Sequence, residues 1–162
     1  MKVTKYNLKI SDGLPKLTKE KSQEYLGDNI SSSKDVVELM SSVYHLDKMA
    51  EEYIYAIGVD TKRKVLGVFE IVHGTVNRAV VSPREIYIRM LLCGACEMFI
   101  VHNHPSGDPT PSQQDIKLTE RIRLSSQLLN IPLLDHVIIG DPGYYSMMEK
   151  GGLIDEYLAQ WK

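Results

Sequence analysis

Two apolar segments separated by a helical segment constrain the fold of this chain most strongly. Residues 96–102 (CEMFIVH) and residues 133–140 (LLDHVIIG) are dominated by apolar side chains, so both are predicted to be buried strands. Residues 113–129 carry Ile116, Ile122 and Leu128 among their apolar positions and predict a helix that begins after Ser112. A strand, a helix and a second strand in this order indicate a crossover connection within a sheet.

The other elements complete a mixed α/β pattern. Residues 53–60 and 64–72 are rich in Val, Ile and aromatic residues and flank a short polar link, which predicts a β-hairpin. Ser32 and Ser82 are candidate N-caps of two further helices. Residues 5–10 predict a short strand, residues 14–33 an irregular extension, and the end of the chain a short helical tail interrupted by Gly151 and Gly152. We therefore predict a three-layer α/β/α sandwich around a mixed β-sheet, with an N-terminal extension at 1–31 and the main domain at 32–162.

Composition excludes several classes of protein. The 162 residues suit one domain, and 43% hydrophobic with 25% charged residues is typical of a globular protein. A net charge of −2 argues against a surface built for nucleic acid, and the basic residues of the 113–129 helix are interpreted as a solvated face. No apolar run approaches the roughly 20 residues of a membrane span, and the N-terminus has no signal-peptide core. We therefore expect a cytoplasmic protein that does not contact a membrane.

Two histidines stand one residue apart at the end of the first buried strand. Side chains at i and i+2 of a strand point the same way, so His102 and His104 can converge on one point. Asp115 follows in the first turn of the next helix, after a loop stiffened by proline and able to bring it back. Two histidines and one carboxylate leave a zinc ion one open position, as in catalytic sites. The alternative is that Ser112 and Asp115 only form a capping box at the helix start.

Glu70 interrupts an otherwise apolar strand with a carboxylate. A charge in a central strand is costly unless it has a partner, and water activated by a metal ion would be one. Glu70 is therefore a candidate general base. The alternative is an edge strand in which Glu70 faces solvent.

Glu70, the run His102-Asn103-His104-Pro105, Ser112 and Asp115 together match the pattern E…H-x-H-P-x6-S-x2-D. This pattern resembles the JAMM motif of the JAB/MPN metallopeptidase superfamily. The flanking segments resemble its RadC-like branch, and the resemblance covers residues 32–152. The segments that carry it are GTVNRAVVSPREI, VHNHPSGDPTPSQQDI, LLDHVIIG and GYYSM.

The resemblance implies a JAB/MPN-like fold, with the architecture of cytidine deaminases, and a catalytic site. In that site His102, His104 and Asp115 would hold Zn²⁺, Glu70 would be the general base, and Ser112 would stabilise the oxyanion. The implied function is a zinc-dependent hydrolase, a metallopeptidase or isopeptidase that acts on a peptide or isopeptide substrate. The alternative is a RadC-type accessory protein of DNA repair or conjugation without catalytic activity. RadC proteins often carry a helix-hairpin-helix region that this sequence does not display, so DNA association rests on the family name alone.

The remaining polar residues near these motifs have two interpretations. Asp135 and His136 lie in the second buried strand and either support the metal site or are structural. Cys93 and Cys96 form a single C-x-x-C at a predicted helix end, where cysteine packs as a small apolar residue, so we interpret them as structural.

Overall fold

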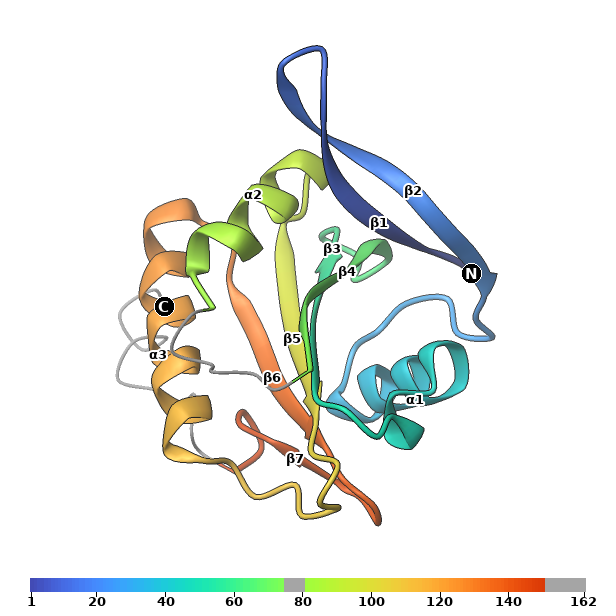
Figure 1. The fold of residues 1–162 in the computed structure, drawn as a ribbon, viewed down its shortest axis with the longest axis vertical. Helices are drawn as coiled ribbons and strands as arrows, with labels where there is room; N and C mark the ends of the chain where they lie inside the picture. Colours follow the sequence, from blue (N-terminus) through green and yellow to red (C-terminus); the bar gives the residue numbers. More distant parts are fainter. Residues whose placement is uncertain (75–80, 151–162) are drawn as a thin grey trace.

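A seven-stranded mixed sheet covered by helices on both faces forms the structure, a computed structural model that describes residues 1–74 and 81–150 (Figure 1). The strands are β1 (Lys2–Ser11), β2 (Leu14–Glu24), β3 (Tyr53–Val59), β4 (Val65–His73), β5 (Glu97–Asn103), β6 (Leu133–Ile139) and β7 (Tyr144–Ser146), and the helices are α1 (Ser33–Tyr44), the 3-10 helix η1 (Leu46–Lys48), α2 (Pro83–Cys93) and α3 (Gln113–Leu129). The strand order is β2-β1-β4-β3-β5-β6-β7. The pairs β1/β4 and β5/β6 are parallel and the others antiparallel, which confirms the predicted mixed sheet. Of the helical tail predicted at the end of the chain, residues 147–150 form a turn after β7, and residues 151–162 lie outside the described residues.

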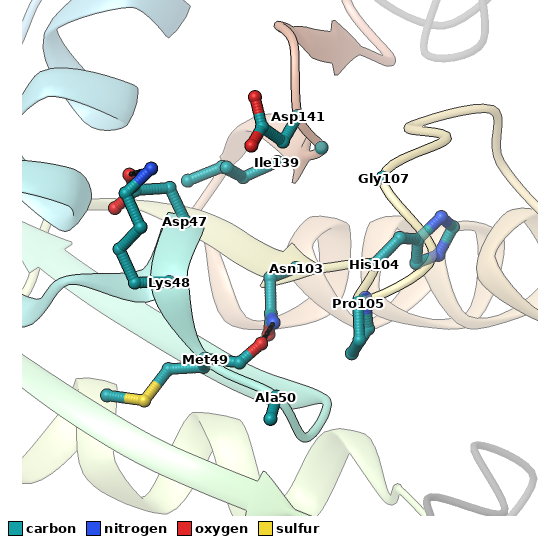
Figure 2. Close-up of a pocket in the computed structure, with 11 residues that line it drawn as sticks. Asp47, Lys48, Met49, Ala50, Asn103, His104, Pro105, Gly107, Ile139 and Asp141 are labelled. Atoms are coloured by element: carbon teal, nitrogen blue, oxygen red, sulfur yellow. Dashed lines mark hydrogen bonds and ion pairs between the residues drawn. The ribbon is translucent and has the colours of Figure 1, made fainter.

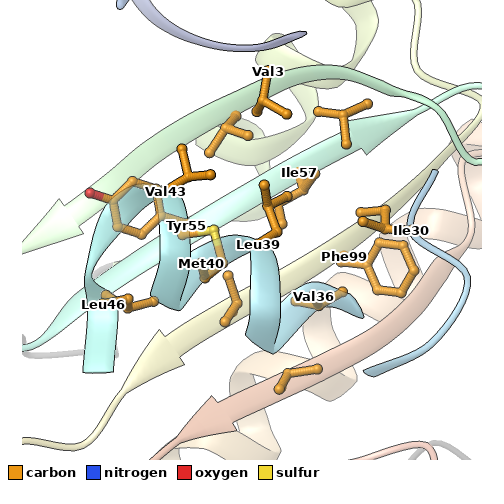
Figure 3. Packing of buried hydrophobic residues seen from close by; sticks show 14 of the residues in the cluster. Val3, Ile30, Val36, Leu39, Met40, Val43, Leu46, Tyr55, Ile57 and Phe99 are labelled. Atoms are coloured by element: carbon orange, nitrogen blue, oxygen red, sulfur yellow. The ribbon is translucent and has the colours of Figure 1, made fainter. Parts of the chain in front are cut away.

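The sheet separates two hydrophobic cores. Helix α1 covers one face, and α2 and α3 cover the other (Figure 1). Alternation along β5 sends Phe99 and Val101 to the α1 face, and Met98 and Ile100 to the opposite face. Figure 3 shows Phe99 in the cluster that α1 covers. His102 follows Ile100 by two residues and therefore lies on the face covered by α3.

The N-terminal segment is a β-hairpin rather than the irregular extension predicted for residues 14–33. Strand β2 pairs with β1 along its whole length, and β1 joins the main sheet through Lys5 opposite Val68. Asp12 and Gly13 connect the strands with positive φ values of 54° and 76°, the conformation that a two-residue hairpin turn requires. The prediction for residues 14–24 was wrong because β2 is an exposed edge strand, which carries little of the apolar alternation that marks a half-buried strand. The Asp-Gly pair was the signal that could have found it.

The helix boundaries agree with the capping signals. Ser32 and Ser112 each accept a hydrogen bond from the backbone of the residue three positions later, and the aspartate there bonds back to the serine backbone. Helix α2 begins at Pro83 after the N-cap Ser82. In residues 1–74 and 81–150, no helix combines the length and the apolar character that crossing a membrane demands.

Candidate metal centre

The structure brings His102, His104 and Asp115 together at the end of β5 and the start of α3. His102 and Asp115 are fully buried, and the His104 side chain is 13% exposed. The Nε2 atoms of the two histidines lie 3.1 Å apart. Asp115 places Oδ1 3.2 Å from His102 Nε2 and Oδ2 3.6 Å from His104 Nε2. These three residues, called the His–His–Asp cluster below, converge from two elements as their spacing predicted.

The spacing of these atoms fits a tetrahedral metal ion. Zinc binds imidazole nitrogen at about 2.0–2.1 Å and carboxylate oxygen at about 2.0–2.2 Å, so two ligand atoms of a tetrahedral site lie about 3.3 Å apart. The three separations in the cluster, 3.1, 3.2 and 3.6 Å, bracket that value. The cluster can therefore hold a metal ion of this size without a large change in side-chain position.

Hydrogen bonds fix the tautomers of both histidines. The Nδ1 atom of His104 lies 2.7 Å from the carbonyl oxygen of Asp108, which only accepts, so Nδ1 carries the proton. For His102 the assignment starts at Thr119, whose hydroxyl donates to the carbonyl of Asp115 at 2.7 Å. That hydroxyl accepts from His136 Nδ1 at 2.5 Å, and His136 Nε2 then accepts from His102 Nδ1 at 2.8 Å.

Both Nε2 atoms of the neutral imidazoles are consequently unprotonated, with their lone pairs turned toward each other and toward Asp115. Two lone pairs and a carboxylate this close repel one another unless a cation lies between them. A metal ion or a shared proton meets that need, and the donor set is the one zinc prefers.

The loop between β5 and α3 is held by its backbone as well as by its prolines. His104 N donates to Ile139 O at 2.8 Å, which ties the start of the loop to β6. Gly107 has a φ of 87°, and a Cβ there would lie 2.9 Å from the Asp141 carbonyl, so glycine is required for the loop to lie against the β6–β7 turn. The loop therefore returns Asp115 to the histidines with little freedom to move.

Glu52, which the sequence analysis did not select, is the glutamate beside the cluster. Its Oε1 atom lies 3.9 Å from Nε2 of both His102 and His104, and its side chain is 19% exposed. Glu52 thus stands next to the point on which the cluster converges, beyond the spacing of the three closer atoms. Glu52, His102 and His104 also form a possible metal-binding group by distance. The only sequence signal was a carboxylate just before an apolar strand, which is common in proteins.

The structure does not bring Glu70 to the cluster, and the assignment of Glu70 as general base is wrong in geometry. Glu70 is opposite Tyr55, whose ring packs in the core under α1, whereas His102 is opposite Ile54 in the core under α2 and α3. The Glu70 carboxylate accepts from Lys5 Nζ at 2.8 Å and from the Tyr55 hydroxyl at 3.3 Å. Strand β4 is a central strand, so the alternative prediction, that Glu70 faces solvent from an edge strand, is wrong as well.

Lys5 is the counter-ion that the buried side of Glu70 requires. Burial raises the pKa of the Glu70 carboxyl, but the hydrogen bond and the charge of Lys5, helped by His73 at 2.9 Å, lower it below its ordinary value. Burial lowers the pKa of the Lys5 ammonium, but its contacts with Glu70 and Glu20 outweigh burial, so the pKa lies above its ordinary value. Glu70 is therefore part of an ion pair between β1 and β4.

Ser112 contacts the cluster through Asp115. Its hydroxyl donates to Asp115 Oδ2 at 2.6 Å, and its backbone N–H donates to the same oxygen at 2.7 Å. The capping interpretation is confirmed, because Ser112 is the N-cap of α3, and its hydroxyl also orients Asp115. A role in stabilising an oxyanion would require the hydroxyl to turn away from Asp115.

The other polar residues singled out in the sequence divide into two groups. His136 supports the cluster through its hydrogen bond with His102. Asp135 points to the other face of the sheet, where its carboxylate accepts hydrogen bonds from the hydroxyls of Ser33 at 2.8 Å and Ser146 at 2.6 Å. Cys93 and Cys96 are free thiols near the opposite end of β5, and burial raises the pKa of Cys93 to about 11. Cys96 precedes His102 by six residues and so lies about 20 Å from it along the strand direction, given about 3.3 Å per residue.

A cavity of about 260 Å³ adjoins the cluster on the side of His104. Its walls come from η1 and the residues after it, from the loop that follows β5, and from the turn after β6 (Figure 2). The residues that line it are Asp47, Lys48, Met49, Ala50, Asn103, His104, Pro105, Gly107, Ile139, Gly140 and Asp141. A ligand in this cavity would reach His104 from outside.

Comparison with known proteins places the chain in a family. Residues 30–153 match the family model described as a RadC-like JAB domain. The chain is 36% identical over 126 residues to a UPF0758 protein of Pelobacter propionicus, which covers 78% of this chain and 54% of that protein. It is 42% identical over 121 residues to a UPF0758 protein of Clostridium perfringens, covering 75% and 52%. The chain spans about half the length of the curated relatives it matches. It belongs to the RadC-like JAB domain family.

Proposed function

We propose that this chain is a zinc-dependent hydrolase that cleaves an amide or isopeptide bond. The observation that carries the proposal is the convergence of two imidazole nitrogens and one carboxylate at 3.1–3.6 Å from one another, with tautomers that turn both Nε2 lone pairs inward. Membership of the JAB family supports a hydrolytic reaction. The substrate class is the one that the resemblance to JAMM metallopeptidases implies.

Each residue of the centre has a separate task in this proposal. His102, His104 and Asp115 would hold zinc, which supplies a Lewis acid for the carbonyl and lowers the pKa of water toward about 7. Glu52 would accept the proton of the attacking water and pass it to the leaving amine, because its carboxylate lies beside the cluster. Ser112 would hold Asp115 in place and, after turning, could donate to the oxyanion.

Two donor sets compete for the metal ion, and the distances favour one of them. Asp115 is 3.2 and 3.6 Å from the histidine nitrogens, close to the edge of a zinc tetrahedron, whereas Glu52 is 3.9 Å from both. Asp115 is also held by two hydrogen bonds from Ser112, as metal-binding carboxylates commonly are. We therefore assign Asp115 as the third ligand and Glu52 as the base.

The first experiment measures the metal content of the purified protein. We expect about one zinc per chain, because the centre supplies one set of three ligands. His104→Ala and Asp115→Ala should lose the metal, and a Cys93→Ser/Cys96→Ser variant is the matched control that should retain it. Full zinc occupancy in both ligand variants, or loss from a folded cysteine variant, would contradict the assignment.

The second experiment identifies the reaction. Peptide and isopeptide substrates are screened against the zinc-loaded protein, with duplex and single-stranded DNA in parallel for cleavage and for binding. We expect amide hydrolysis that His104→Ala abolishes, and no tight DNA binding by a chain with a net charge of −2. Sub-micromolar DNA binding with a steep salt dependence, and no hydrolysis, would favour an accessory role in DNA repair or conjugation.

A further inference from the structure

We propose that Asn103 is a positioning residue that holds Glu52 against the His–His–Asp cluster. This inference rests on the proposed function, because it takes Glu52 to be the base beside the metal ion. Asn103 stands between the two histidines in sequence and is only 3% exposed. Alternation along the strand directs its side chain to the face opposite that of His102, so Asn103 takes no part in the cluster itself.

The Asn103 side chain binds the backbone on both sides of Glu52. Its Nδ2 donates to the carbonyl oxygens of Met49 at 3.3 Å and Glu51 at 3.0 Å. Its Oδ1 accepts from the backbone N–H of Tyr53 at 2.9 Å. Both N–H groups and the oxygen of the Asn103 amide are thus hydrogen-bonded, and these bonds fix which end of the amide is Nδ2 and which is Oδ1. Residues 51 and 53, the two neighbours of Glu52, are thereby fixed to the end of β5.

No backbone group of β5 performs this task. The ladder between β3 and β5 ends where Ile54 is opposite His102. Beyond that pair the chain turns toward β6, and the N–H of His104 donates to Ile139 O at 2.8 Å. The Asn103 side chain therefore continues the ladder for one more step. From the other side, the Glu52 carbonyl accepts from Gly74 N at 2.9 Å, so Glu52 is anchored on two flanks.

The same anchor shapes the cavity beside the cluster. Met49 and Ala50 form one wall next to Asn103 and His104, and Figure 2 shows the Asn103 amide directed at the Met49 backbone. Displacement of residues 49–53 would thus move both the Glu52 carboxylate and the wall of the cavity. The metal ligands would stay in place, because the Asn103 amide binds the backbone of Met49, Glu51 and Tyr53 and is directed away from the face of His102. This division of tasks accounts for an asparagine between the two histidines.

The test uses Asn103→Leu, which has a similar volume and no hydrogen-bonding groups. The matched control is Asn29→Ala, since Asn29 is also an asparagine that donates to a loop carbonyl, that of Lys62, but at the exposed surface. Amide exchange followed by NMR should be about tenfold faster at Tyr53 in Asn103→Leu and unchanged in the control. Co²⁺ affinity should stay within about twofold of wild type, since the ligands are intact.

The position of Glu52 is read from the visible absorption spectrum of the Co²⁺-loaded protein at neutral pH. Glu52→Gln should change this spectrum, and Asn103→Leu should change it in the same sense. Wild-type exchange at Tyr53, or faster exchange with a wild-type spectrum while Glu52→Gln differs, would overturn the inference. Should Asn103→Leu not fold, Asn103→Asp replaces it, which keeps an acceptor for Tyr53 N but loses both donors and should still change the spectrum.

The proposed metal centre and the role of Asn103 can be refuted independently of each other. A wild-type protein that does not bind Co²⁺, or a Glu52→Gln variant with the wild-type spectrum, would contradict the proposed metal centre or its base. In either case the exchange rate at Tyr53 still decides whether Asn103 anchors residues 49–53.

Discussion

Replacing each of two glutamates by glutamine separates a base from a structural ion pair. Glu52 lies 3.9 Å from Nε2 of both histidines, while Glu70 accepts a hydrogen bond from Lys5 at 2.8 Å on the other face of the sheet. Glutamine keeps the shape of glutamate but cannot accept a proton at neutral pH. Glu52→Gln should therefore retain zinc and lose activity, whereas Glu70→Gln should retain both zinc and activity and lose stability.

The magnitudes follow from the two environments. Loss of a general base typically lowers the rate by about 10²–10⁴-fold, which is about 2.7–5.4 kcal/mol of transition-state free energy at about 1.36 kcal/mol per tenfold. Glu70→Gln leaves the Lys5 ammonium, 15% exposed, with Glu20 at 3.2 Å as its remaining carboxylate. Hydrogen bonds between charged groups contribute about 1.5–3 kcal/mol, so the free energy of unfolding should fall by about that amount or less.

The assay measures kcat and KM on a substrate found in the amide and isopeptide screen, zinc content by elemental analysis, and stability by urea unfolding. Glu70→Gln is the matched control for Glu52→Gln, because both changes remove one carboxylate from the same hairpin region. Wild-type turnover by zinc-loaded Glu52→Gln would refute the role of Glu52. A loss of turnover beyond about tenfold in folded, zinc-loaded Glu70→Gln would refute the separation of the two faces.

Three further predictions concern the surroundings of the centre. His136→Ala should weaken zinc binding by about 10–100-fold, because it removes the acceptor that fixes the His102 tautomer; zinc titration with a competing chelator measures this, and wild-type affinity would contradict it. Folding lowers the pKa of Glu70 from 4.5, so the stabilising pairing with Lys5 is complete above pH 4.5 and is lost as the pH falls through the pKa of the folded state. The difference in free energy of unfolding between wild type and Glu70→Gln, measured by urea unfolding, should therefore narrow between pH 7 and pH 3. A constant difference would count against the ion pair. Ser112→Ala should lower the free energy of unfolding by about 0.5–2 kcal/mol through loss of the helix N-cap. If the hydroxyl also donates to the oxyanion, kcat should fall by about 10²–10³-fold at unchanged zinc content. An unaltered kcat would mean that Ser112 only holds Asp115 in place.

Local sequence determined most of the elements and the three residues of the His–His–Asp cluster. Serine caps mark the starts of α1 and α3, Gly94 ends α2 with a φ of 70°, and apolar runs mark β5 and β6. The face shared by His102 and His104 and the return of Asp115 in a first helical turn were also predictable. Each of these depends on the period of a strand, the geometry of a cap or a short loop, all of which are fixed within a few residues.

Which of the two glutamates lies beside the cluster was decided only by the tertiary structure, because strand register decides which face of the sheet a side chain occupies. Val59 is opposite Val65, and an unbroken register from that pair would place Glu70 opposite Ile54, beside His102. A shift between Gly58 and Val59 instead places Glu70 opposite Tyr55, and a shift of one residue moves a side chain to the other face of a sheet. Its partner Lys5 lies in strand β1, 65 residues earlier in the sequence. Likewise, His136 contacts His102, and Asn103 binds the residues around Glu52, only because their strands are neighbours in the sheet. Strand pairing joins residues far apart in the sequence, and no local pattern indicates which strands will pair.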